Sequence, residues 1–210
     1  MGADSDVRRW LRLRGAETIQ HPGGTLYAHL CRVHDRLAEL ECGVDTQLAG
    51  LAHAVYSTDG FDVTLLDWND RAALRNLIGD DAEALVYLYG ACDRRRTWRE
   101  LATTGEVVDR FTDQTWHLSP GQMRPFVDLS IVNELDVLDQ DPSTVDKHGA
   151  YFRSLFAAWA PIASPQVTSE VQRLLGEGNQ STSARAQKGQ SVPARQTAPG
   201  QPRPAIQPHA

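Results

Sequence analysis

The sequence predicts an all-α domain followed by a C-terminal tail that has no core. Apolar residues recur with a period near 3.6 in one segment after another, and helix start and stop signals frame these segments. No Gly-rich phosphate loop follows a strand-like run, and no Gly-x-Ser-x-Gly elbow is present. Residues 1–175 have an ordinary globular composition and are numerous enough to enclose one core, so we expect a single helical domain.

The tail, residues 176–210, differs in composition from the rest of the chain. It has no aromatic residue, and its large aliphatic residues are Val192 and Ile206. Such a segment buries too little apolar surface to offset its ordering entropy, so we expect it to be disordered. It carries a net charge of +3, which leaves −9 on the body of a chain whose total is −6. The acidic body lacks the basic surface that is usual in a nucleic-acid-binding domain. The basic tail is still compatible with weak, salt-sensitive contacts with a polyanion.

Cysteine usage and hydropathy indicate a soluble cytoplasmic protein. The chain has three cysteines, an odd number, without Cys-x-x-Cys spacing, which favours reduced thiols over a disulfide framework. The N-terminus has no apolar signal-peptide core, and nowhere do about eighteen apolar residues run together as a membrane span requires.

We expect five helices in the first half, each with a local signal. Thr25 is a good N-cap after the Pro22-Gly23-Gly24 turn, Asp67 to Asp70 offer capping side chains, and Gly15 and Gly79 are typical stops. The expected ranges are 4–14, 25–40, 45–56, 67–79 and 80–89.

The second half begins less regularly and ends in clear helices. Residues 97–100 fit a capping box, whereas 105–118 lack helical period and form either a small hairpin or an ordered loop. Ser119-Pro120-Gly121-Gln122 is a strong start signal for a helix through Leu138. Ser143 is the expected cap of a helix through Trp159, and the last helix is expected over residues 165–175.

Two histidines in apolar helices, His29 and His53, are the most informative candidates for a chemical site. A single histidine on an apolar face is usually a hydrogen-bonded core residue. Two of them 24 residues apart, with a later aspartate, Asp128, also in an apolar helix, make a site an equal alternative. His34-Asp35 is read instead as a partly exposed polar pair, and His21 as a loop residue beside a turn.

The runs Gly24-Thr25-Leu26-Tyr27-Ala28-His29 and Leu48-Ala49-Gly50-Leu51-Ala52-His53 resemble the first two metal-ligand helices of the HD-domain superfamily of metal-dependent phosphohydrolases. The similarity is closest to the hydrolase domains of alarmone synthetase/hydrolases. It implies an HD-domain-like helical bundle and a divalent metal, Mn, Fe, Zn or Mg, held by His29, His53 and Asp128.

The sequence departs from this pattern where the superfamily has its second metal-binding carboxylate. The residue after His53 is Ala54 rather than aspartate, and Leu129-Ser130 follows Asp128 in place of the usual Arg-Leu. Two neutral imidazoles with one carboxylate bind metal more weakly and activate water less. Asp59 and Glu134 are the candidate substitutes, either to complete the shell or to take a proton from water.

The run His53-Ala54-Val55-Tyr56-Ser57-Thr58-Asp59, with the later Val132-Asn133-Glu134-Leu135-Asp136, is similar to an uncharacterised bacterial family of HD-like proteins. This second resemblance covers most of the folded body. It implies that the alanine belongs to the family pattern, and it supplies no activity. Asn133 and Glu134 also fit an interhelical hydrogen-bond network.

Arg94, Arg95 and Arg96 are the candidate phosphate ligands, because guanidinium groups match phosphate oxygens; the alternative is a charged helix end in water. Trp116 and His117 either close over a ligand or pack on their own domain.

Together these observations predict a protein that binds a divalent metal and a phosphorylated small molecule or nucleotide, and they leave open whether it hydrolyses that ligand. The alternative is a non-catalytic HD-like module for ligand sensing or interaction, in which the same residues form a buried polar network. An HD-type di-iron oxygenase fits less well, because it needs more ligands than the sequence offers. Substrate, metal identity, oligomeric state and pathway do not follow from the sequence.

Overall fold

The computed structural model describes residues 2–176. Over these residues the predicted all-α class is confirmed. The only strands in this part of the chain are short and form two antiparallel hairpins, β1 (Gln20–His21) with β2 (Gly24–Thr25) and β3 (Glu106–Val108) with β4 (Thr115–His117). The predicted tail lies, apart from Gly176, outside the described residues. The helices are α1 (Ala3–Leu13), α2 (Leu26–Glu39), α3 (Val44–Ala52), α4 (Arg71–Ile78), α5 (Asp80–Ala91), α6 (Arg94–Thr97), α7 (Leu101–Thr104), α8 (Pro120–Gln140), α9 (Pro142–Trp159) and α10 (Pro165–Leu175).

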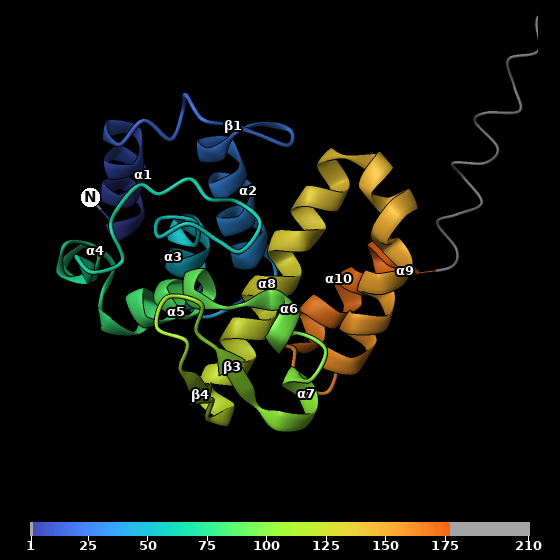
Figure 1. Cartoon of the computed structure of the whole chain (residues 1–210). Helices are drawn as coiled ribbons and strands as arrows, with labels where there is room; N and C mark the ends of the chain where they lie inside the picture. Colours follow the sequence, from blue (N-terminus) through green and yellow to red (C-terminus); the bar gives the residue numbers. More distant parts are fainter. Residues whose placement is uncertain (1, 177–210) are drawn as a thin grey trace, which may run out of the picture. The chain divides into compact units, whose positions relative to one another are not determined.

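Helix α8 passes through the middle of the domain (Figure 1). Helices α2, α3 and α5 contact it on one side, and α9 and α10 contact it on the other. Every residue from Phe126 to Asp136 is buried, so the helix is covered around its whole circumference. Polar residues in such a helix must find partners inside the protein, because water does not reach them. This requirement determines the arrangement of the candidate site.

Helices α2 and α3 approach each other closely, and the sequence shows why. The Thr25 side chain accepts a hydrogen bond from the Ala28 N–H at 3.2 Å, which confirms the predicted N-cap of α2. A Cβ atom added to Gly50 of α3 would lie 2.4 Å from Leu37 Cδ1, so a larger residue here would force the Leu37 side chain to move. Helix α3 ends at Ala52, four residues before the predicted end, and His53 is its C-cap.

Three start signals in the second half have different outcomes. The capping box expected at residues 97–100 is wrong, since Asp93 caps α6 by accepting from the Arg96 N–H at 3.0 Å and Thr97 is the last helical residue. At the start of α8 the predicted box is present, with the Gln122 side chain accepting from the Ser119 N–H at 3.1 Å. The helix expected to begin at Ser143 is capped two residues earlier, by Asp141. Of the two alternatives for residues 105–118, the hairpin is present as β3 and β4.

Two further expectations from the sequence concern membrane-spanning helices and disulfide bonds. Within residues 2–176 no helix is long and apolar enough to cross a membrane. All three cysteines, Cys31, Cys42 and Cys92, are free thiols.

Candidate functional site

His29 and His53 meet in the interior between α2, α3 and α8. Their Nε2 atoms lie 3.2 Å apart, and the two side chains belong to residues that are 1% and 2% exposed. The Nδ1 atom of His53 donates to the Gly50 carbonyl at 2.7 Å, a bond that the C-cap position of His53 makes possible. With Nδ1 carrying the proton, Nε2 of His53 presents a lone pair. Burial and the neighbouring His29 lower the pKa of His53 well below its usual value, so this ring is neutral at pH 7.

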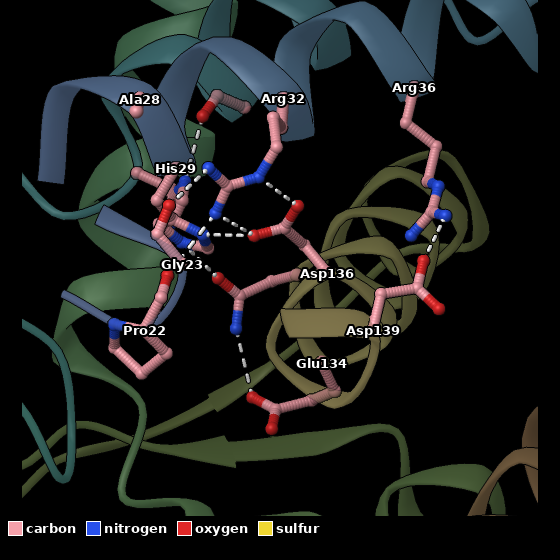
Figure 2. Close-up of polar contacts among 12 residues, drawn as sticks. Pro22, Gly23, Ala28, His29, Arg32, Arg36, Glu134, Asp136 and Asp139 are labelled. Atoms are coloured by element: carbon pink, nitrogen blue, oxygen red, sulfur yellow. Dashed lines mark hydrogen bonds and ion pairs between the residues drawn. The ribbon is translucent and has the colours of Figure 1, made fainter. Parts of the chain in front are cut away.

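The other face of His29 is held by a buried ion pair. Nδ1 of His29 lies 2.7 Å from Oδ2 of Asp136, and Arg32 binds both carboxylate oxygens of Asp136 at 2.7 and 2.9 Å (Figure 2). Burial alone would raise the pKa of Asp136, but the hydrogen bonds from His29 and Arg32 outweigh it and lower the pKa to about 2. The carboxylate is therefore charged and accepts the Nδ1–H of His29.

A second ion pair reaches the histidines through an amide. Arg94 donates to Glu134 Oε1 at 2.8 Å, and the Asn133 side-chain NH₂ donates to the same oxygen at 2.9 Å. This contact fixes the orientation of the amide, because a carboxylate only accepts. Oδ1 of Asn133 is then the atom that lies 3.0 Å from His29 Nε2. The Nε2 atom of His29 is thus close to both a second imidazole nitrogen and an amide oxygen.

Two states account for the short distances among these three polar atoms. In the first, His29 carries a proton on each nitrogen and donates from Nε2 to His53 and Asn133, which makes it a buried imidazolium beside Asp136. In the second, both Nε2 atoms and Oδ1 present lone pairs to a shared cation. Among residues 2–176 no group of three or more His, Cys, Asp and Glu side chains is arranged to hold a metal ion, so any such site depends on the amide of Asn133.

His21, which the sequence assigned to a loop, belongs to this centre. Hairpin β1–β2 places its ring on His29, with ring centroids 4.0 Å apart, and Phe61 contacts its edge. Burial and the adjacent His29 lower the pKa of His21 to about 4. Its Nδ1 atom is buried without a hydrogen-bond partner. The turn residues Pro22 to Gly24 signal the hairpin, but no local pattern shows which helix the hairpin covers.

The structure does not place Asp128 with the histidines, and this corrects the expected metal set. Oδ1 of Asp128 accepts from the Ser164 N–H at 2.8 Å at the start of α10. At about 100° per residue, Asp128 points about 140° away from Asn133 around α8. Burial raises its pKa, although the Ser164 hydrogen bond opposes the shift. Asp136, two turns further along, is the aspartate that contacts His29.

The other predicted residues are divided between the centre and its surroundings. Glu134 lies one hydrogen bond from the centre, through Asn133. Asp59 accepts from the backbone N–H of Arg94 at 2.9 Å and forms no hydrogen bond with either imidazole. His34 and Asp35 contact each other and Arg8 near the surface, as the sequence indicated.

The three arginines have three different environments. Arg94 is bound to Glu134 and to the Tyr89 hydroxyl, and Arg96 pairs with Asp113 at 2.7 Å on the surface. Arg95 is exposed and lines a pocket of about 610 Å³ together with Arg94. The other lining residues, which sequence reasoning missed, are Trp98, Arg99 and Tyr151. Arg99 follows Arg95 by four residues, a spacing in the sequence that offered a signal, although α6 ends at Thr97; Tyr151 comes from α9.

The comparisons with known proteins give one partial match to a family model and no activity. A family model described as a domain of unknown function, DUF6817, matches residues 10–94. The matched segment includes both histidines and ends before α8, which supplies Asn133, Glu134 and Asp136. No curated protein and no solved structure matches the chain.

Proposed function

We propose that this protein binds one divalent transition-metal cation between His29, His53 and Asn133, and a phosphorylated small molecule in the adjoining arginine-lined pocket. The observation that carries the proposal is the pair of Nε2 atoms 3.2 Å apart, each on a ring whose Nδ1 is already engaged. Metal-binding histidines are typically oriented in this way, with the second ring nitrogen donating to a carboxylate or a backbone carbonyl.

The donor set fits a borderline-soft cation. Nitrogen ligands bind tetrahedral zinc at about 2.0–2.1 Å, which separates two of them by about 3.3 Å. Imidazoles suit Zn and Fe, whereas Mg and Mn prefer carboxylates and water. Of the four metals that the sequence suggests, Zn and Fe are therefore expected to bind more tightly than Mg and Mn. A bound cation of this kind would supply Lewis-acid stabilisation of a phosphoryl oxygen.

The arginine-lined pocket supports the phosphate part of the proposal. Arg94 connects it to the histidine centre, because the same guanidinium binds Glu134. Arg95 has no hydrogen-bond or ion-pair partner among the described residues, and Arg99 lies near the Tyr151 ring, 5.8 Å from its centroid. A chain with a net charge of −6 needs such a local cationic patch to attract an anion.

Binding is the core of the proposal, and hydrolysis is a further step that a separate assay decides. Glu134 is the carboxylate placed to hold a proton, but Arg94 and Asn133 both engage its Oε1. Ala54 is buried and brings no charge. We expect release of inorganic phosphate from nucleoside di- and triphosphates to be slow, and loss of that release in Glu134→Gln would assign the proton-holding role.

Metal content tests the first part. Protein purified without chelator should contain about one equivalent of Zn or Fe, and added metal should raise the Tm of chelator-treated protein. His53→Ala should abolish both effects, whereas His148→Ala, an exposed histidine on α9, should change neither. Absence of bound metal together with an unchanged Tm would contradict the proposal.

A designed carboxylate sharpens this test. Ala54→Asp adds the carboxylate that the HD resemblance implies at this position. The metal-free variant should be less stable than wild type by about 1–3 kcal/mol, because a buried carboxylate without partners is costly. Added zinc should recover that loss and bind more tightly than in wild type. Destabilisation that metal does not relieve would place residue 54 outside the metal shell.

The phosphate part is tested with pyrophosphate as the probe. Calorimetry should detect binding to wild-type protein and at least about tenfold weaker binding to the double variant Arg95→Ala/Arg99→Ala, because each charge-assisted contact contributes about 1.5–3 kcal/mol. Arg96→Ala is the matched control, since its side chain pairs with Asp113 outside the pocket. Equal loss in both variants would indicate non-specific attraction only.

The second candidate is a non-catalytic module, and the way in which hydrogen-bond donors and acceptors pair in the centre supports it. If His29 holds two protons, the polar groups of His29, His53, Asn133 and Asp136 are satisfied without a cation. In that case ¹⁵N NMR of the purified protein should show a proton on each ring nitrogen of His29, and zinc should leave its signals unchanged.

A further inference from the structure

A second pocket, remote from the histidines, lies on the outer face of α5. Its volume is about 590 Å³, within the range of small-molecule sites. Helix α5 separates it from the histidine centre, since Ala84, Leu88 and Ala91 line the pocket while Tyr89 contacts the His53 ring. The apolar side chains that line it come from α5, the β3–β4 hairpin and α8, and are Ala84, Leu85, Leu88, Ala91, Val107, Leu118 and Pro125.

An exposed tryptophan is fixed at the rim of this pocket. Trp116 is 47% exposed, yet its Nε1 donates to Asp109 Oδ2 at 3.3 Å. Asp109 is buried and also accepts from the Tyr87 hydroxyl at 2.9 Å. The indole is therefore held at one end while much of its surface remains open to solvent. An aromatic side chain fixed in this way offers its ring to a ligand at low entropic cost.

The charges around the pocket are negative and uncompensated. Asp45 and Asp81 line it, and neither has a hydrogen-bond or ion-pair partner among residues 2–176. Arg71 also lines it, but two of its three guanidinium nitrogens, Nε and Nη2, bind the buried Glu83 at 2.7 and 2.8 Å, so this carboxylate offsets its charge. The remaining titratable lining residues are His117, Tyr87 and the buried Asp109, whose carboxylate accepts from Tyr87 and Trp116. An anion would be repelled here, whereas a cation would meet two free carboxylates and an aromatic ring.

We propose that this pocket binds a small organic amine, with the ammonium group against Trp116, Asp45 and Asp81 and an apolar body on the floor of the pocket. An ammonium over an indole face is attracted by the ring quadrupole, and nearby carboxylates add to that attraction. The apolar floor excludes inorganic cations as the preferred ligand, because they would leave it exposed. This site is independent of the histidine centre and of the phosphate pocket.

Three probes with the same phenyl group test the chemistry: phenethylamine, the neutral 2-phenylethanol and the anionic phenylacetate. Each probe is titrated into the full chain, and binding is measured by calorimetry and by the amide NMR shifts of Ala84 and Leu88. The amine should bind with a Kd of about 1 mM or tighter. The alcohol should bind at least about tenfold more weakly, and the anion should not bind. Equal affinity for amine and alcohol, or no binding of the amine, would overturn the proposal.

Matched variants test the location. Trp116→Ala should weaken amine binding by about tenfold, which is within the range of cation–π energies, and Asp45→Asn/Asp81→Asn should do the same. The ring of Tyr151 is also exposed but lines the arginine pocket, so the control variant Tyr151→Ala should bind the amine as wild type does. Spermidine, which carries charge without an apolar body, should bind more weakly than phenethylamine. Loss of binding in Tyr151→Ala alone, or spermidine binding as tight as that of phenethylamine, would refute the assignment.

Discussion

Two buried aspartates on the same helix, Asp128 and Asp136, have opposite environments. Asp136 faces α2, where Arg32 and His29 both bind its carboxylate, and its pKa is lowered to about 2. Asp128 faces α10, where its hydrogen-bond donor is a backbone N–H, and burial raises its pKa. Both residues are less than 5% exposed. Burial alone therefore does not determine the direction in which the pKa of a carboxyl group shifts; the presence of a cationic partner across the helix interface does.

The largest expected effect comes from removing Asp136. Asp136→Ala leaves Arg32 and His29 without their shared carboxylate, and breaking a buried pair in this way costs about 3–5 kcal/mol. Asp139→Ala is the matched control three residues further along α8, because Asp139 pairs with Arg36 nearer the surface (Figure 2) and should contribute about 0–1 kcal/mol. Urea unfolding measures both. Equal losses would show that the centre contributes no more than a surface ion pair.

The pH dependence of stability should show the next largest effect. A lowered pKa means that Asp136 stabilises the fold above its ordinary value of 3.8, and this contribution is lost as the pH falls toward about 2. At 1.36 kcal/mol per pKa unit the loss amounts to about 2 kcal/mol. The free energies of unfolding of chelator-treated wild type and Asp136→Asn should therefore converge as the pH falls from about 5 to about 2, a range that includes the ordinary carboxyl pKa. Curves that remain parallel would assign the acid sensitivity to other groups.

The smallest effect, with the opposite sign, is expected at Asp128. A raised pKa means that this carboxyl favours the folded state below 3.8 and loses that contribution as the pH rises through its raised value. Asp128→Asn keeps an oxygen for the Ser164 N–H and removes the buried charge. We expect the variant to gain up to about 1 kcal/mol over wild type at neutral pH and nothing under acidic conditions. A loss of stability at neutral pH would mean that the charge itself holds the start of α10.

Part of the candidate centre was predictable from the sequence. His29 and His53 stand out because each is a polar residue in an apolar helix, and the structure brings them together. The choice of Asp128 over Asp136 failed because one helix that is covered on every side offers several buried polar residues, and the sequence does not show which face meets α2. Asn133 and Glu134 were singled out as a possible network, and that network is present between His29 and Arg94.

His21 and Tyr151 could not be assigned from local patterns. His21 lies in a two-residue strand, and its position on His29 depends on how the β1–β2 hairpin folds over α2. Tyr151 reaches the pocket from α9, which is separated from Arg99 by more than forty residues. A contact between segments so far apart depends on tertiary packing and leaves no local signal.

By itself the sequence determined the helical class, most of the helix starts and the two histidines, because periodicity, capping and isolated polar residues are local properties of the chain. The tertiary structure decided which carboxylate faces the histidines, which arginine is free to meet a ligand and where Trp116 is exposed. These outcomes depend on the rotation of α8 and on the packing of distant segments, so they follow from long-range contacts rather than from residue order.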